Sequence, residues 1–179
     1  MDALLFNEAK ISELGDILAL LFDDKAGRKR ERIDESTLPS YRLAFEAIGK
    51  DPNAHLITVK QNDIIIGIAQ LNFIANLTYQ GGVRAQIEGV RVHKDCRSQG
   101  IGKQLFEYLI EIAKQRGCHL VQLTTDKSRP EAYRFYQQLG FVNSHDGFKL
   151  HLVSKITQPV KKKSWYAFCN EFKSVQASL

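Results

Sequence analysis

The chain has 179 residues, of which 44% are hydrophobic, and a formal net charge of +5 at pH 7. This length fits one domain with a hydrophobic core of its own, whereas two full domains would be cramped. Five lysines against one glutamate in the last 25 residues carry most of the net charge. The remainder is close to neutral and lacks the spread basic surface that is typical of nucleic-acid binding.

The cysteines and the N-terminus predict where the protein works. Cys96, Cys118 and Cys169 have neither the spacing of a disulfide framework nor that of metal ligands, which indicates a reducing compartment and no metal site. Asp2 and Glu8 stand among the first apolar residues and argue against a signal peptide, and no apolar run reaches membrane-spanning length. We therefore expect a cytoplasmic protein that binds neither membrane nor nucleic acid.

The N-terminal third predicts one strand followed by two helices. Residues 3–6 are a first strand, and Ser12 is placed to cap a helix with an apolar face of Leu14, Ile17, Leu18 and Leu21. Residues 23–35 mix charges of both signs and predict an exposed connection. A second helix is expected over residues 39–48, ending before Gly49.

An antiparallel meander is expected next. Residues 55–60 and 64–73 are β-rich and are joined around residues 61–63. A second reversal near Gly81 and Gly82 leads into a third strand.

The third strand changes its period near Glu88 and Gly89. Apolar residues stand at odd positions up to Ile87, whereas Val90 and Val92 continue at even positions. A slip of one residue is what a β-bulge produces, and a bulge would leave main-chain N–H and C=O groups unpaired. The alternative is that the strand simply starts late, at Val90.

A glycine-bearing turn and a helix follow this strand. Gly100 and Gly102 stand at the helix start, and Gly117 supplies a left-handed stop. The buried face is predicted from the spacing of Ile101, Leu105, Leu109, Ile112 and Ala113. A helix start offers unpaired N–H groups to an anion such as a phosphate. The pattern is neither a P-loop nor the dinucleotide fingerprint, and a tight turn without a ligand is the alternative.

The remaining chain completes a mixed sheet. Residues 120–125 are expected to lie parallel to the third strand after the helical crossover. A helix begun by Pro130 and ended by Gly140 has Tyr136 on its apolar side. A last strand is predicted from the alternation of Phe148, Leu150 and Leu152. The expected order is β-α-α-β-β-β-α-β-α-β-β, and the aromatic tail packs on the same molecule or on the mate in a homodimer.

Two motifs in this order resemble those of the GNAT N-acetyltransferase superfamily. The run Arg97-Ser98-Gln99-Gly100-Ile101-Gly102 resembles motif A, and the stretch from Arg129 to Phe141, with Ala-x-x-Phe-Tyr-x-x-x-Gly-Phe, resembles motif B. The resemblance implies an α/β (α+β) GNAT fold: a mixed, mostly antiparallel central sheet with a β-bulge and a V-shaped split, flanked by helices on both faces. It covers roughly residues 3–153, so we expect an acetyltransferase domain over 1–153 and an extension over 154–179.

The family resemblance also implies a binding site for acetyl-CoA. In that family the glycine-bearing turn holds the pyrophosphate and the bulged strand bonds the pantetheine arm. Carried over residue by residue, the cofactor-binding set is Val90, Arg91, Val92, Arg97, Ser98, Gln99, Gly100, Ile101, Gly102, Lys103 and Tyr133. Arg129 and Lys94 stand where many members have asparagine and proline, so no asparagine contact to CoA is carried over.

Two residues are candidates for the proton transfers. Glu88 is either the general base for the amine or a solvated strand residue. Tyr136 stands where many GNAT enzymes have their general acid, and its alternative role is core packing. His93 is either a proton relay or a surface histidine. Cys96 has no activating neighbour in the sequence and is treated as a bystander.

The resemblance implies transfer of an acetyl group from acetyl-CoA to a primary amine of a small molecule, by direct attack in a ternary complex. Residues 128–136 and 144–148 most resemble the branch with aminoalkylphosphonate acetyltransferases. Two alternatives stay open: acetylation of a protein lysine or N-terminus, and a non-catalytic acyl-CoA-binding sensor.

Overall fold

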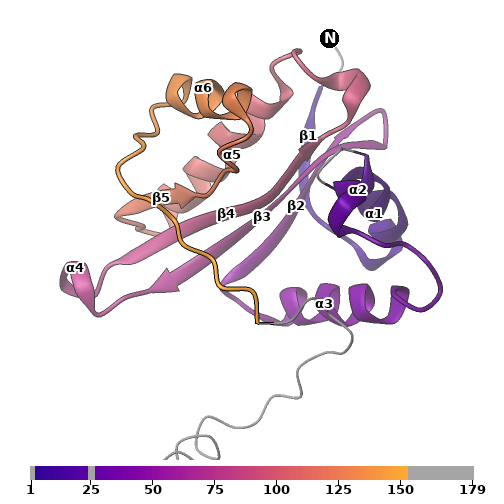
Figure 1. The fold of residues 1–179 in the computed structure, drawn as a ribbon, viewed down its shortest axis with the longest axis horizontal. Helices are drawn as coiled ribbons and strands as arrows, with labels where there is room; N and C mark the ends of the chain where they lie inside the picture. Colours follow the sequence, from indigo (N-terminus) through magenta and orange to yellow (C-terminus); the bar gives the residue numbers. More distant parts are fainter. Residues whose placement is uncertain (1–2, 24–26, 153–179) are drawn as a thin grey trace, which may run out of the picture. The chain divides into compact units, whose positions relative to one another are not determined.

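A five-stranded sheet forms the centre of the structure, a computed structural model that describes residues 3–23 and 27–152. In space the strands follow the chain order, and all neighbours are antiparallel except β4 and β5, which are parallel. The predicted meander and parallel crossover are thus confirmed (Figure 1). The strands are β1 (Leu5–Glu8), β2 (Ala54–Gln61), β3 (Ile64–Ala75), β4 (Val83–Val92) and β5 (Leu120–Leu123).

The predicted bulge lies in β4. Glu88 pairs with Gln70 and Arg91 pairs with Ile68, so Gly89 and Val90 together stand opposite one residue of β3. Gly89 has a φ of +63°, a left-handed conformation that suits glycine and is the usual first residue of one bulge type. The period slip near Glu88 is therefore a bulge within one long strand.

Helices lie on both faces of the sheet (Figure 1). One face has α1 (Leu14–Phe22) and α3 (Leu38–Lys50), and the other has α5 (Ile101–Gln115) and α6 (Pro130–Gln138). The short elements are η1 (Ile11–Glu13), α2 (Gly27–Arg30), α4 (Thr78–Gly81) and η2 (Lys94–Cys96). This arrangement confirms the expected fold class.

The larger core lies between the sheet and the α5–α6 pair. On α5 the predicted apolar stripe is confirmed, because Ile101, Leu105, Leu109 and Ala113 are each at most 4% exposed. Phe106, which the spacing did not single out, is also fully buried and contacts the ring of Phe135 from α6. The smaller core lies on the opposite face, where Ile17 and Leu20 of α1 pack with Ile65, Ile68 and Phe45.

The predicted last strand is wrong. Residues 141–152 contain no strand, and the side chains of Phe148, Leu150 and Leu152 are 97%, 86% and 85% exposed. Alternation supplies one apolar face, but a strand also needs a neighbour that accepts and donates its main-chain hydrogen bonds. The described residues therefore hold five strands instead of the seven expected.

One smaller expectation also needs correction. Ser12 lies inside η1 and α1 begins at Leu14, so Ser12 does not cap that helix. The reversal expected near Gly81 and Gly82 is present before β4, and it includes α4 over residues 78–81, with Tyr79 and Gln80 in left-handed conformations. The exposed connection over residues 23–35 contains the short helix α2.

The chain divides into two units after Phe148. The first unit, residues 1–148, contains all the helices and strands named above. Residues from 153 on lie outside the described residues, so the boundary predicted at 153/154 and the packing of the aromatic tail stay predictions. No helix of the described residues is long and apolar enough to cross a membrane.

Candidate active site

The loop between β4 and α5, with the first turn of α5, presents a row of backbone N–H donors at residues 98–103, which we call the donor row. Within residues 3–23 and 27–152, no group accepts a hydrogen bond from the backbone N–H of residues 98–103, and the first intrahelical bond joins Gln104 N to the Gly100 carbonyl. Gly100 is the N-cap of α5, and its φ of +80° turns the chain into the helix. The loop and first helical turn thus offer N–H groups and the positive end of the α5 dipole to an anion.

Two side chains fix the shape of this loop. Gln99 Nε2 donates to the Asp95 carbonyl at 2.9 Å, and Arg97 Nε donates to the Val92 carbonyl at 3.0 Å. The Arg97 guanidinium also lies 3.8 Å from Asp23 Oδ2 at the end of α1, and its side chain is about half exposed. Ser98 takes a left-handed conformation with φ +61°. Arg97 therefore positions the loop while keeping other N–H donors available.

The first turn of α5 contributes mainly through its backbone. Ile101 is 4% exposed, so only its main chain is available to a ligand. A Cβ atom on Gly102 would stand 3.4 Å from the ring of Phe135, an ordinary contact. Lys103 is two-thirds exposed and pairs with Glu107 at 3.7 Å, one turn further along the helix. Its ammonium group adds positive charge near the donor row.

The bulge coincides with a split between β4 and β5. Their pairing runs from Arg84–Leu120 to Ile87–Leu123, and β4 continues to Val92 with β3 as its only strand partner in the described sheet. Val90 and Val92 pack against the larger core. Arg91 Nη1 donates to the Val90 carbonyl at 2.8 Å. Beyond the bulge, β4 can therefore bind a ligand through main-chain groups on its free edge.

Tyr136 lies on the α6 side of this split. Its ring is half-buried and packs against Phe106, Phe135 and Phe141 at centroid distances of 5.6, 5.5 and 6.2 Å. Burial raises the pKa of the Tyr136 phenol, and the positive charge of Arg129, followed by that of Arg91, offsets part of this rise. The phenol thus keeps its proton at neutral pH. Tyr133, one turn earlier in α6, is 39% exposed.

Glu88 lies on the other face of the sheet. Ala85 and Ile87 of β4 point into the larger core, so Gln86 and Glu88 point toward the α1–α3 face. Glu88 is exposed. The two catalytic candidates are therefore not adjacent: Tyr136 belongs to the α5–α6 side and Glu88 to the opposite side, with the split of the sheet between them.

The sequence of this site matches a known family. The model of the acetyltransferase (GNAT) family matches residues 18–141, which include the donor row, the bulge, Glu88 and Tyr136. The chain belongs to the GNAT family. It is accordingly an N-acetyltransferase.

Relatives of this acetyltransferase include proteins with named substrates. The aminoalkylphosphonate N-acetyltransferase of Salmonella typhimurium is 31% identical over 115 residues, which are 64% of this chain and 74% of that protein. A Bacillus halodurans C-125 structure described as a transcriptional regulator is 51% identical, with a TM-score of 0.81 over 84% of this chain and all of that one. A putative acetyltransferase from Agrobacterium tumefaciens is 25% identical, with a TM-score of 0.72 over 82% and 99% of the two chains.

The residues present fit the acetyl-CoA that the GNAT family uses. The donor row matches the chemistry of a diphosphate, and the absence of side chains at Gly100 and Gly102 lets it approach the backbone. The free edge of β4 beyond Ile87 suits a pantetheine arm with its amide groups. The individual contacts assigned to residues 90–103 and to Tyr133 stay predictions.

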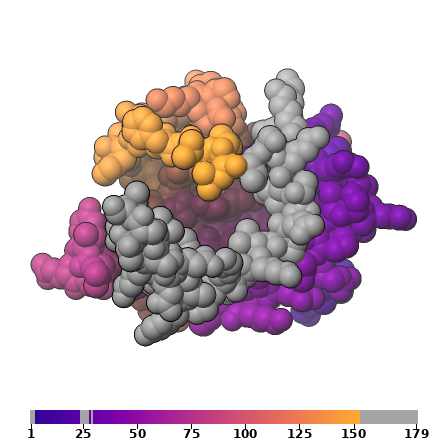
Figure 2. Space-filling view, turned by 60° about the horizontal axis from the view of Figure 1, so that its bottom comes forward, coloured from indigo at the N-terminus to yellow at the C-terminus, as the bar shows by residue number. Residues whose placement is uncertain are grey.

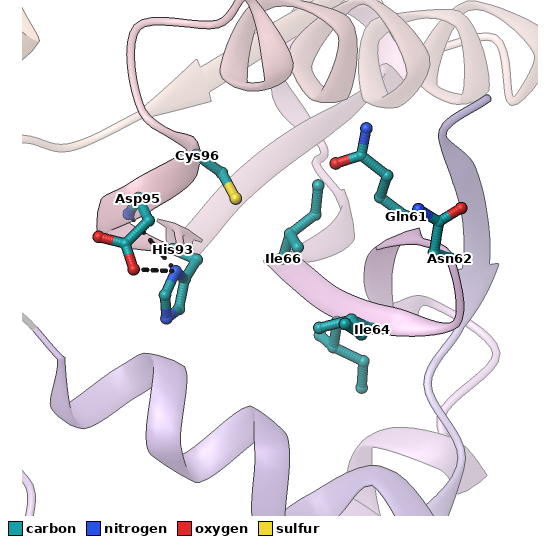
Figure 3. Close-up of a pocket in the computed structure, with 8 residues that line it drawn as sticks. Gln61, Asn62, Ile64, Ile66, His93, Asp95 and Cys96 are labelled. Atoms are coloured by element: carbon teal, nitrogen blue, oxygen red, sulfur yellow. Dashed lines mark hydrogen bonds and ion pairs between the residues drawn. The ribbon is translucent and has the colours of Figure 1, made fainter. Parts of the chain in front are cut away.

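A separate open pocket of about 270 Å³ lies beside η2 (Figure 3). The β2–β3 turn lines it with Gln61, Asn62 and Ile64, and η2 with its N-cap lines the opposite side with His93 and Cys96. His93 accepts a hydrogen bond from Asp95 N at 3.4 Å and thereby caps η2. This favours a structural role for His93 over a proton relay. The pocket includes neither Glu88 nor Tyr136, and no metal-binding cluster of His, Cys, Asp or Glu occurs among the described residues.

Sequence reasoning missed the polar residues that share the face of Glu88. Arg84 and Gln86 precede it at intervals of two, opposite the apolar positions Ala85 and Ile87. Gln122 Nε2 of β5 donates to Gln86 Oε1 at 2.6 Å. The alternation that placed Ala85 and Ile87 in the core already implied this polar face.

Proposed function

We propose that this GNAT enzyme transfers an acetyl group from acetyl-CoA to a primary amine of a small molecule, by direct attack of the amine in a ternary complex. The observation that carries the proposal is the split of β4 and β5 at the bulge, next to the donor row of α5. Acetyl-CoA supplies the thioester whose acetyl group is transferred. Its bound carbonyl would be reachable from the Glu88 side, and its sulfur from the Tyr136 side.

Glu88 is the proposed general base. An alkylamine with a pKa of about 10.4 is almost entirely protonated at pH 7, so a proton must leave before the nitrogen can attack. Glu88 is exposed on the face of the sheet where an amine can enter, and no described residue pairs with its carboxylate. It would take the proton directly or through one water.

Tyr136 is the proposed general acid. The departing sulfur is a thiolate, and its protonation makes departure easier. Because the pKa of the phenol is raised, the hydroxyl stays protonated until the thiolate leaves and can accept its proton. No described group accepts a hydrogen bond from the Tyr136 hydroxyl, which leaves this proton free to be donated.

Two alternative functions are distinguishable by experiment. A protein lysine or N-terminus could replace the small amine. A non-catalytic acyl-CoA sensor is the second alternative, and the description of the Bacillus halodurans relative as a transcriptional regulator favours testing it. The Salmonella relative, whose name specifies an aminoalkylphosphonate, supports the small-molecule proposal. A cytoplasmic location and a homodimer stay predictions.

The test is a screen of CoA release with acetyl-CoA and candidate acceptors. It should include polyamines, amino acids, aminophosphonates, aminoglycosides and lysine peptides. Amine-dependent CoA release with a small acceptor and not with peptides supports the proposal. Release only with peptides would establish the protein-acetylating alternative, and tight acetyl-CoA binding without release on any amine would establish the sensor.

A further inference from the structure

The sheet face that bears Glu88 carries a connected set of amide side chains. Asn72, Gln86 and Gln122 stand side by side across β3, β4 and β5, because Asn72 pairs with Gln86 and Gln86 pairs with Gln122. Gln70, which pairs with Glu88, donates to Asn72 Oδ1 at 2.9 Å. We call Gln70, Asn72, Gln86 and Gln122 the amide row. It runs from the middle of the sheet to its β5 edge.

The amide row occupies a part of this face that the smaller core does not cover. Ile17 and Leu20 of α1 pack on Ile65 and Ile68, near the C-terminal end of β4. In Figure 2, α4 (magenta) lies at one side of the view and the N-terminal helices (purple) lie at the other. Gln86 is only 8% exposed and the other members of the row are half-buried. These amides therefore form a recessed polar floor.

Arg84 stands at one end of this floor, and its Nε has no hydrogen-bond partner among the described residues. It lies two residues before Gln86 on the same face of β4. Its Nε is buried without a hydrogen-bond acceptor, and no carboxylate of the described residues pairs with its guanidinium. A buried donor without an acceptor is unfavourable and calls for an explanation. A guanidinium fits a carboxylate, phosphate or phosphonate, because its N–H groups match two oxygens at once.

Arg84 and Glu88 face the same side of one strand at a fixed separation. Four residues of an extended strand span roughly 13 Å between Cα atoms. Both side chains are long enough to reach toward the floor between them, where Gln86 lies. A ligand with an amine at one end and an anion at the other could therefore contact Glu88, the amide row and Arg84 together.

We propose that the amine acceptor carries an anionic group, a carboxylate or a phosphorus oxyanion, which Arg84 binds while Glu88 holds the amine. The inference rests on the proposed function, since it takes Glu88 as the residue that meets the amine. Arg84 is then a specificity-determining residue, and the amide row supplies neutral donors and acceptors to the atoms between the two charged groups.

The experiment compares matched acceptors on wild type and Arg84→Gln. The acceptors are ω-amino carboxylates of three to six carbons, 2-aminoethylphosphonate, and alkylamines of equal length that carry no anionic group. Wild type should prefer an anionic acceptor at least tenfold in kcat/KM. Arg84→Gln should lose 10- to 100-fold on that acceptor, mainly in KM, and change less than twofold on the alkylamine. The chain length with the highest kcat/KM then reports the distance between the amine site at Glu88 and the anion site at Arg84. The ratio of kcat/KM for the carboxylate to that for the phosphonate identifies the preferred anion.

Controls separate this inference from the proposed function. Lys114→Gln removes one positive charge from the exposed end of α5 and should leave every kcat/KM unchanged. A second readout is calorimetric binding of 5-aminopentanoate and 2-aminoethylphosphonate to enzyme saturated with CoA, which requires no turnover. Binding that Arg84→Gln abolishes supports the anion site even if no amine is acetylated. Equal losses on acceptors with and without the anionic group, or no binding of either probe to wild type, would overturn it.

Discussion

At the scale of single residues, Tyr136 has two roles that one substitution separates. Tyr136→Phe keeps the ring that packs on Phe106, Phe135 and Phe141 and removes only the hydroxyl. If the phenol is the general acid, turnover should fall by about 10²- to 10⁴-fold while acetyl-CoA affinity stays close to wild type. Steady-state kinetics and calorimetry measure the two effects.

The matched control is Tyr108→Phe, whose ring stacks on Phe6 in the core at 4.8 Å and which has no proposed catalytic role. Because burial raises the pKa of Tyr136, the wild-type rate should not lose this acid below pH 10. A fall of less than about threefold in Tyr136→Phe, with an unchanged melting curve, would leave only the packing role.

Glu13 carries a stability prediction of its own. It is 9% exposed, forms an ion pair with Lys60, and accepts from Lys10 N at 2.8 Å. Burial raises the pKa of the Glu13 carboxyl, but the bonds from Lys60 and Lys10 lower it further, to below its ordinary value of 4.5. The stabilisation is thus present above pH 4.5 and is lost as pH falls through the folded-state value. Glu13→Gln should cost about 1–3 kcal/mol at pH 7.

Urea unfolding at pH 7 and at pH 3 tests this. The difference in stability between Glu13→Gln and wild type should be smaller at pH 3 than at pH 7, because protonation of the wild-type carboxylate increases as the pH falls toward its lowered pKa. Glu111→Gln, which breaks an exposed pair with Lys114, should change stability by less than about 0.5 kcal/mol. An undiminished difference at pH 3 would show that charge is not the cause.

At the scale of elements, the start of α5 can be tested with two glycines that share a backbone strain. Gly100 and Gly117 have φ values of +80° and +72°, and a Cβ on either would meet no other atom within 4 Å. Alanine at each should therefore cost about 1–2 kcal/mol of stability. Only Gly100→Ala should also weaken acetyl-CoA binding, because it lies in the donor row. Calorimetry measures the acetyl-CoA affinity of both folded variants. Equal affinities of Gly100→Ala and Gly117→Ala would contradict the interpretation that this turn binds the phosphates.

The elements differ in how well the sequence predicts them. The buried apolar face of α5 and the β-bulge near Glu88 were both predictable. Each depends only on contacts within one element and with its neighbour. The last strand was not, since Phe148, Leu150 and Leu152 show alternation but no partner strand pairs with them. Motifs located the donor row. They could not reveal the unpaired Nε of Arg84, because a missing partner is visible only in three dimensions.

At the scale of the whole molecule, the C-terminal extension is predicted to be dispensable for cofactor binding. All candidate cofactor-binding residues and both catalytic candidates precede Phe141, and the family match ends at residue 141. A chain that ends near Lys155 should therefore keep acetyl-CoA affinity within about twofold of the full chain, even if solubility or dimerisation suffers. Calorimetry compares the two. A folded but non-binding truncated chain would move the domain boundary toward the C-terminus.

The strand order also has a consequence for how the molecule assembles. The turns that join β2, β3 and β4 are short, whereas β5 meets β4 only after a detour through α5, with Leu120 opposite Arg84. Contacts between residues far apart in sequence form late in folding because the intervening loop must first be closed. The β4–β5 pairing beside the split would thus form after the central meander, and local unfolding should begin at this pairing. Acetyl-CoA at 100 times its Kd would add about 2.7 kcal/mol to stability, and its strongest effect on amide hydrogen exchange should appear in β5 and the second half of β4.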